Sequence, residues 1–71
     1  MGIEVTAGQV WREYIGGSHA RTLHILGVDM GVVRVRCIKY GTKSRFGLKR
    51  WLDAAHAADG ARWVLRLEAA P

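Results

Sequence analysis

Residues that could act as a nucleophile and its base are few and scattered along the chain. Ser18 stands next to His19, Cys37 is the single cysteine, and His24 and His56 lie far from one another. A catalytic triad needs a nucleophile, a base and a group that orients the base, all within hydrogen-bond reach. Sequence neighbours on a glycine-rich loop rarely meet in that geometry, and no carboxylate stands beside Ser18 and His19. We therefore expect a polar loop there and no enzyme activity.

The chain lacks the residues that a metal or cofactor site requires. A zinc site uses about four ligands in closely spaced pairs, whereas the chain has one cysteine and three separated histidines. Cys37 follows Val33 and Val35 at a spacing of two residues, so we expect it on the same apolar strand face. A buried free cysteine acts there as a small hydrophobic residue. Asp53 and Asp59 lie in an alanine-rich stretch, where solvated acids are expected. With no glycine-rich phosphate motif present either, we expect no metal and no cofactor.

The strongest functional signal is the segregation of charge. No acid lies between Asp29 and Asp53, and that stretch holds seven of the eleven basic residues: Arg34, Arg36, Lys39, Lys43, Arg45, Lys49 and Arg50. On adjacent antiparallel strands, alternate basic side chains share one outer face. Such a face, with Tyr40 at the connecting turn, suits a phosphate backbone or an acidic protein surface. The alternative is a solvated face that protects strand edges.

The three tryptophans, Trp11, Trp51 and Trp63, are expected in the core, because they can supply much of the area that a small domain buries. Trp51 stands where the strand pattern gives way to a helical one. If it were exposed, it would act as an interface anchor.

Short segments rich in β-branched and aromatic residues, separated by glycines, predict five strands. They cover residues 9–15, 21–28, 32–38, 44–52 and 62–68, with a hairpin turn at Asp29, Met30 and Gly31. In the last segment Trp63, Leu65 and Leu67 alternate with Val64, Arg66 and Glu68. After Arg50 the pattern predicts one or two helical turns that end near Gly60. A longer helix over residues 48–58 is the alternative.

Length and composition indicate one small domain over residues 1–71, with its core in about 8–67. With 71 residues the chain buries only about 60% of its unfolded surface, for which a homodimer would compensate. The 49% of apolar residues is sufficient for folding. No apolar run could span a bilayer, no signal peptide opens the chain, and one cysteine suits a reducing compartment, so we expect a cytoplasmic protein without a membrane partner. The net charge of +5 favours anionic partners.

The order of features resembles a known group of small proteins. GQVWRE is followed by RTLHILGVD, by VVRVR, by SRFGLKR and by WVLRL. The segments resemble small SH3-like barrel proteins of phage and bacterial genomes, mostly without assigned function. The resemblance covers most of residues 8–67 and implies a five-stranded all-β barrel with a short helical turn before the last strand. Residues 54–61 depart from it, since this alanine-rich segment is longer than expected.

Three functions follow as expectations. The first is nucleic-acid binding through the phosphate backbone, without catalysis, by the basic residues and Tyr40. The second is a protein-binding module in a bacterial or phage-infected cell, such as an anti-CRISPR-like inhibitor of a host complex. It would use the basic face or an apolar patch of Trp51 and the alanine-rich segment. The third, an enzyme assembled from several copies, has only the small size of the chain in its favour.

Overall fold

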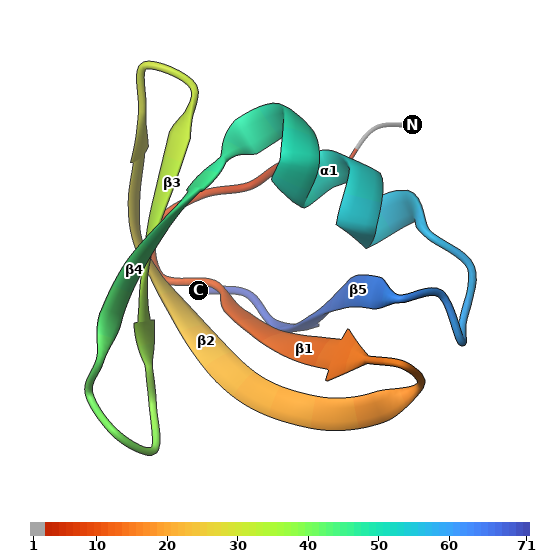
Figure 1. Ribbon diagram of the computed structural model, residues 1–71. Helices are drawn as coiled ribbons and strands as arrows, with labels where there is room; N and C mark the ends of the chain where they lie inside the picture. Colours follow the sequence, from red (N-terminus) through yellow and green to blue (C-terminus); the bar gives the residue numbers. More distant parts are fainter. Residues whose placement is uncertain (1–2) are drawn as a thin grey trace.

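The computed structural model describes residues 3–71 and shows one antiparallel sheet of five strands with a single helix (Figure 1). In chain order the elements are β1 (Val10–Ile15), β2 (Ser18–Asp29), β3 (Val32–Cys37), β4 (Lys43–Gly47), α1 (Leu48–His56) and β5 (Trp63–Ala69). The strands lie in the order β4-β3-β2-β1-β5. This confirms a mainly β fold. Within the described residues β4 and β5 are the two sheet edges, so the sheet is not closed.

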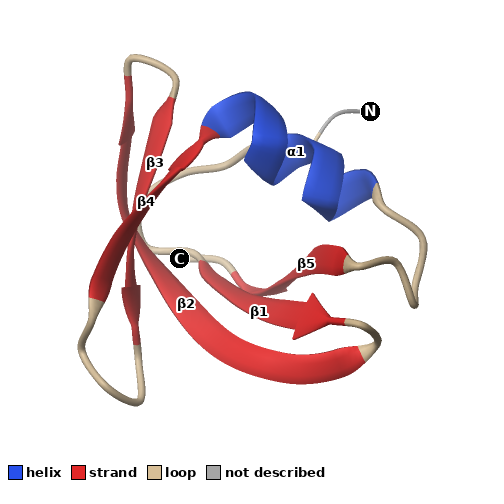
Figure 2. Cartoon of the chain, viewed as in Figure 1, coloured by secondary structure: helices blue, strands red, loops and turns tan. Residues whose placement is uncertain are grey.

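The sheet is bent strongly enough to enclose a core. Figure 2 shows the β3–β4 hairpin standing at an angle to β1, β2 and β5, with α1 over the open side between them. β2 has 12 residues and pairs with β1 and β3 on its two sides. Its pairing with β3 is irregular between Ile25 and Gly27, and such a bulge bends a strand and increases its twist. Because of the bend, the two halves of the sheet cover the core from two sides.

The hairpin turns follow the local sequence. Gly16 and Gly17 join β1 to β2, and Met30 and Gly31 join β2 to β3. All four residues have positive φ, between 50° and 85°, which matches the two-residue turns that suit the twist of antiparallel strands. The predicted turn at Met30 and Gly31 is therefore confirmed. Met30 is the non-glycine residue among them, and it adopts φ 50°.

The helix is close to the longer of the two predicted possibilities. It begins at Leu48, directly after β4 ends at Gly47, so the predicted strand over residues 44–52 is wrong beyond Gly47. Leu48, Trp51 and Ala55 recur at helical spacing and turn toward the core. The expected helix end near Gly60 is also wrong, because α1 ends at His56. No helix in residues 3–71 is long and apolar enough to cross a membrane.

The core lies between the concave side of the sheet and α1. Trp11 and Trp51 are both 0% exposed and meet edge to face, with ring centroids 5.5 Å apart. Phe46 also packs on Trp51, at 5.6 Å. Trp51 is therefore a core residue, and the expectation that it anchors an interface is wrong. Helical geometry after Gly47 turns its ring inward.

The other core members are mostly aliphatic. The fully buried ones are Leu23, Ile25, Val33, Val35 and Leu65, and Cys37 is 3% exposed beside them. Cys37 thus has the predicted role of a small hydrophobic residue. The predicted alternation fails at β5, because Val64 is 3% exposed and Leu67 is 45% exposed. Val64 lies opposite Tyr14 on β1, on the face that was expected to be polar.

One buried carboxylate ties three strands together. Glu13 is 2% exposed and accepts hydrogen bonds from Arg21 Nε at 2.7 Å, Arg21 Nη2 at 3.0 Å and Trp63 Nε1 at 2.7 Å. Burial raises the pKa of Glu13, but the hydrogen bonds from Arg21 and Trp63, with the charge of Arg21, hold that pKa below its ordinary value of 4.5. The ionised form is therefore the one that the fold stabilises.

This carboxylate gives the protein an acid sensitivity that can be measured. A carboxylate whose pKa is lower in the folded state than in the unfolded state stabilises the fold at pH values above its unfolded-state pKa. This stabilisation is lost as the pH falls through the folded-state pKa. We expect the free energy of unfolding to drop between about pH 5 and pH 3 more steeply in the wild type than in Glu13→Gln. Urea titrations at several pH values measure both slopes. Parallel curves for the two proteins would contradict this role of Glu13.

Candidate functional site

Four basic side chains stand opposite one another on the outer face of β3 and β4. The register pairs Arg34 with Arg45 and Arg36 with Lys43. All four are exposed, whereas Val33 and Val35, which alternate with the two arginines, are buried. Successive side chains of a strand point to opposite faces, so these four share one face. We call Arg34, Arg36, Lys43 and Arg45 the cation ladder.

The cation ladder is not neutralised by the acids of the chain. Within residues 3–71 the ion pairs are Arg12–Glu68 at 2.7 Å, Arg21–Glu13 at 2.7 Å and Arg66–Asp59 at 3.0 Å. All three use arginines outside the acid-free stretch. Like charges directly opposite on neighbouring strands destabilise a sheet, and the ladder contains two such pairs in succession. The fold therefore carries an electrostatic cost at this face.

On the β2 side the ladder is bordered by the bulge. Arg34 lies opposite Gly27, and a Cβ atom at Gly27 would collide with Nη2 of Arg34. The missing side chain lets the guanidinium lie across β2. Next to it is a hollow of about 490 Å³, lined by Leu26, Arg34, Val35, Lys43, Ser44 and Arg45. His24, opposite Arg36, extends the same side of β2.

Lys39 and Tyr40 lie in the turn between β3 and β4, where the sequence predicted them. Nζ of Lys39 is 5.3 Å from the centroid of the Tyr40 ring, a cation–π contact. The turn borders a second hollow of about 460 Å³. Ile38, 54% exposed, is part of the same border. Sequence reasoning missed Ile38, although the alternation through Cys37 could have placed it on the outer face.

The remaining predicted residues, Lys49 and Arg50, lie on the first turn of α1 rather than on the sheet. Both are exposed. Arg50 turns toward β5, with Cζ 5.1 Å from the centroid of the Trp63 ring. It lines a separate hollow with Glu13 and Phe46. The seven predicted basic residues therefore occupy three places, and the ladder is the one that gathers four of them.

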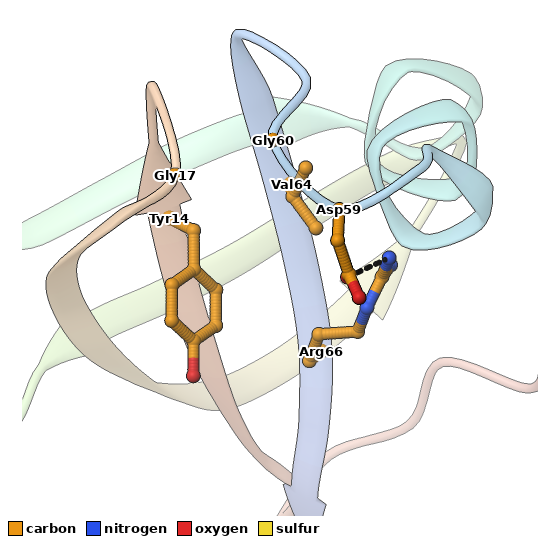
Figure 3. Close-up of a pocket in the computed structure, with 6 residues that line it drawn as sticks. All are labelled: Tyr14, Gly17, Asp59, Gly60, Val64 and Arg66. Carbon is orange, nitrogen blue, oxygen red and sulfur yellow. Dashed lines mark hydrogen bonds and ion pairs between the residues drawn. The ribbon is translucent and has the colours of Figure 1, made fainter.

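A further hollow of about 290 Å³ lies between β1, β5 and the loop after α1 (Figure 3). Its one cation, Arg66, already has partners. Arg66 pairs with Asp59 at 3.0 Å and donates from Nη1 to the carbonyl oxygen of Ala55 at 2.9 Å. It also donates to the carbonyl oxygen of Ala57. Arg66 thus holds the end of α1 against β5, which the sequence did not indicate.

The residues considered for catalysis and metal binding do not converge. Nε2 of His19 is 3.3 Å from Oγ1 of Thr22, and its ring lies beside Tyr14 at 5.7 Å. His56 Nδ1 lies 2.8 Å from the carbonyl oxygen of Leu52 in its own helix. In the described part of the chain no three histidine, cysteine or acidic side chains come together as metal ligands would.

The ladder therefore brings four like charges together on one face, and strand register places them there. Each of its arginines carries five N–H donors and Lys43 carries three, all on an exposed surface, and this suits the binding of multiply charged anions. Comparisons of the chain with protein-family models, with curated proteins and with solved structures found no match.

Proposed function

We propose that this protein binds nucleic acid without catalysis, and that the cation ladder holds the phosphate backbone. The observation that carries the proposal is the pairing of Arg34 with Arg45 and of Arg36 with Lys43 on one exposed face. Each pair sets like charges opposite one another on neighbouring strands, an arrangement that is unfavourable in a sheet. A polyanion placed along the ladder would neutralise both pairs at once, so binding would relieve the electrostatic cost.

The chemistry of the ladder favours phosphate contacts over base reading. Three of its four members are arginines, whose planar guanidinium binds two oxygens of a phosphate at the same time. Contacts of this kind position a protein on nucleic acid but carry no sequence information. The proposed binding is therefore weakly sequence-specific and strongly dependent on salt. The remaining basic residues, Lys39, Lys49 and Arg50, add to the positive potential around it.

We infer further that the fold is a variant of the SH3-like barrel, as the resemblance suggests. Support comes from five short antiparallel strands in one bent sheet, with β1 between β2 and β5. A helix before the last strand agrees as well, although α1 is longer than the short helical turn expected. Barrels of this type bind nucleic acids, peptides or proteins. The fold is therefore compatible with nucleic-acid binding but is not evidence for it.

The test is a fluorescence-anisotropy titration of labelled oligonucleotides at about 50 and about 200 mM salt. If the four ladder cations each neutralise a phosphate, log K falls against log salt with a slope of about −2.8 for single strands or −3.6 for duplex. The affinity then drops about 50- to 150-fold over this range. Absence of binding at the lower salt concentration, or binding that is indifferent to salt, would refute the proposal.

A second candidate is binding of an acidic protein surface, as in a phage-encoded, anti-CRISPR-like inhibitor of a host complex. The observation in its favour is Met30, which is 93% exposed in the β2–β3 turn and has no use in phosphate binding. The apolar-patch version of this function is wrong, because Trp51, Ala54 and Ala55 are all buried. If no oligonucleotide binds at low salt, the acidic-protein candidate replaces the first.

A further inference from the structure

We propose that the cation ladder takes single-stranded rather than double-stranded nucleic acid, and that Tyr40 and Ile38 contact its unstacked bases. This inference rests on the proposed function and specifies its ligand.

Ile38 and Tyr40 directly follow β3 in the chain. Beyond Cys37 the chain stays beside β2, because the backbone N–H of Ile38 donates to the carbonyl oxygen of Thr22 at 3.0 Å. Side chains of a strand alternate between its faces, so Ile38 follows Arg34 and Arg36 on the outer face. Tyr40 lies two residues further, in the turn. Ile38 and Tyr40 therefore follow the ladder along the chain, at the end where Arg36 faces Lys43.

Tyr40 is 73% exposed, whereas every other tyrosine, phenylalanine and tryptophan among residues 3–71 is buried or half-buried. The ammonium of Lys39 lies over the ring at 5.3 Å, which restrains the ring and leaves most of it open to solvent. Next to it is the hollow of about 460 Å³, also lined by Arg12, Arg21 and Thr22.

Single and double strands present different surfaces to a protein. In a duplex the bases are stacked and paired, so a protein meets phosphates, sugars and the edges of base pairs. A tyrosine ring can stack only on a base that has left the helix. Single strands offer such bases, and a basic groove combined with an exposed aromatic ring is how proteins bind them without sequence preference. The ladder alone would bind the phosphates of single-stranded and double-stranded nucleic acid alike. The exposed ring of Tyr40 favours the single strand.

The experiment compares three labelled ligands in anisotropy titrations at about 50 mM salt. They are an oligothymidylate of about 16 nucleotides, an abasic strand of the same length, and a duplex of that length, because single-strand sites cover about 4–16 nucleotides. The abasic strand keeps the phosphates and lacks the bases. We expect the wild type to bind the oligothymidylate about 5- to 100-fold more tightly than the abasic strand. Equal affinities, or tighter binding of the duplex, would overturn the inference.

Matched variants separate the two proposals. Tyr40→Ala should remove most of the preference for oligothymidylate over the abasic strand, with Ile38 retaining a smaller part, while Tyr40→Phe, which keeps the ring, should bind like the wild type. Met30→Ala removes an apolar side chain that is more exposed than Tyr40, 93% against 73%, at the other end of β3, and it should change nothing. If Tyr40→Ala binds normally while Arg34→Glu does not, the stacking role is wrong and the ladder remains. If the wild type binds none of the ligands, both proposals fail.

Discussion

Replacing Trp51 with alanine is expected to destabilise the protein by about 3–5 kcal/mol. The ring is fully buried and packs against both Trp11 and Phe46, so it connects α1 to β1 and β4. A single core in a chain of this size supplies only about 3–5 kcal/mol of stability. The variant should therefore be largely unfolded at 25 °C, as measured by circular dichroism and urea titration. A cooperative transition near the wild-type midpoint would contradict the central position of Trp51.

A second substitution separates ring packing from the polar atom of the indole. Within the described residues Nε1 of Trp51 is buried without a hydrogen-bond partner, and an unsatisfied buried group costs about 1–3 kcal/mol. Trp51→Phe removes that group and keeps an aromatic ring. Its loss of stability should therefore be well below that of Trp51→Ala. Equal losses would show that the full indole volume decides the packing.

Reversing one charge of the ladder is expected to weaken binding while it strengthens the fold. Arg34→Glu places a carboxylate opposite Arg45 and converts a repulsive cross-strand pair into an attractive one. Such pairs contribute about 0.2–1 kcal/mol, so the urea midpoint should rise. The same change removes a phosphate contact and adds a negative charge. The affinity for an oligonucleotide at about 50 mM salt should fall about 10- to 100-fold.

Arg62→Glu is the matched control for this prediction. Arg62 is exposed outside the ladder, near Trp63, and its reversal changes the net charge by the same amount. If the net charge alone governed binding, the two variants would weaken it equally. A larger effect of Arg34→Glu assigns binding to the ladder. A fall in stability for Arg34→Glu would show that Arg34 and Arg45 do not repel each other in the free protein.

Much of the local structure could be predicted from the sequence. The alternation in residues 33–37 identified β3, its buried side with Cys37 and its basic side with Arg34 and Arg36. The step at Met30 and Gly31 identified a hairpin turn. These predictions were correct because side-chain alternation and the tolerance of positive φ are properties of a few neighbouring residues. The acid-free stretch likewise identified where unpaired positive charge would gather.

Tertiary structure decided the rest. Residues 48–52 fit a strand or a helix locally, and the packing of Trp51 between Trp11 and Phe46 selects the helix. That choice removed Trp51 from the surface and separated Lys49 and Arg50 from the sheet.

Strand register likewise decided which cations face each other. The pairing of Arg34 with Arg45 depends on the turn around Gly41, where a shift of one residue would move every β4 side chain to the other face. The contacts of Glu13 join three strands, among them Trp63, which is 50 residues away in the sequence. The sequence by itself determined the elements and the sign of the charge, because both depend on residue type and short spacing. Which residues meet was decided by the fold, because such contacts depend on the packing of the whole chain.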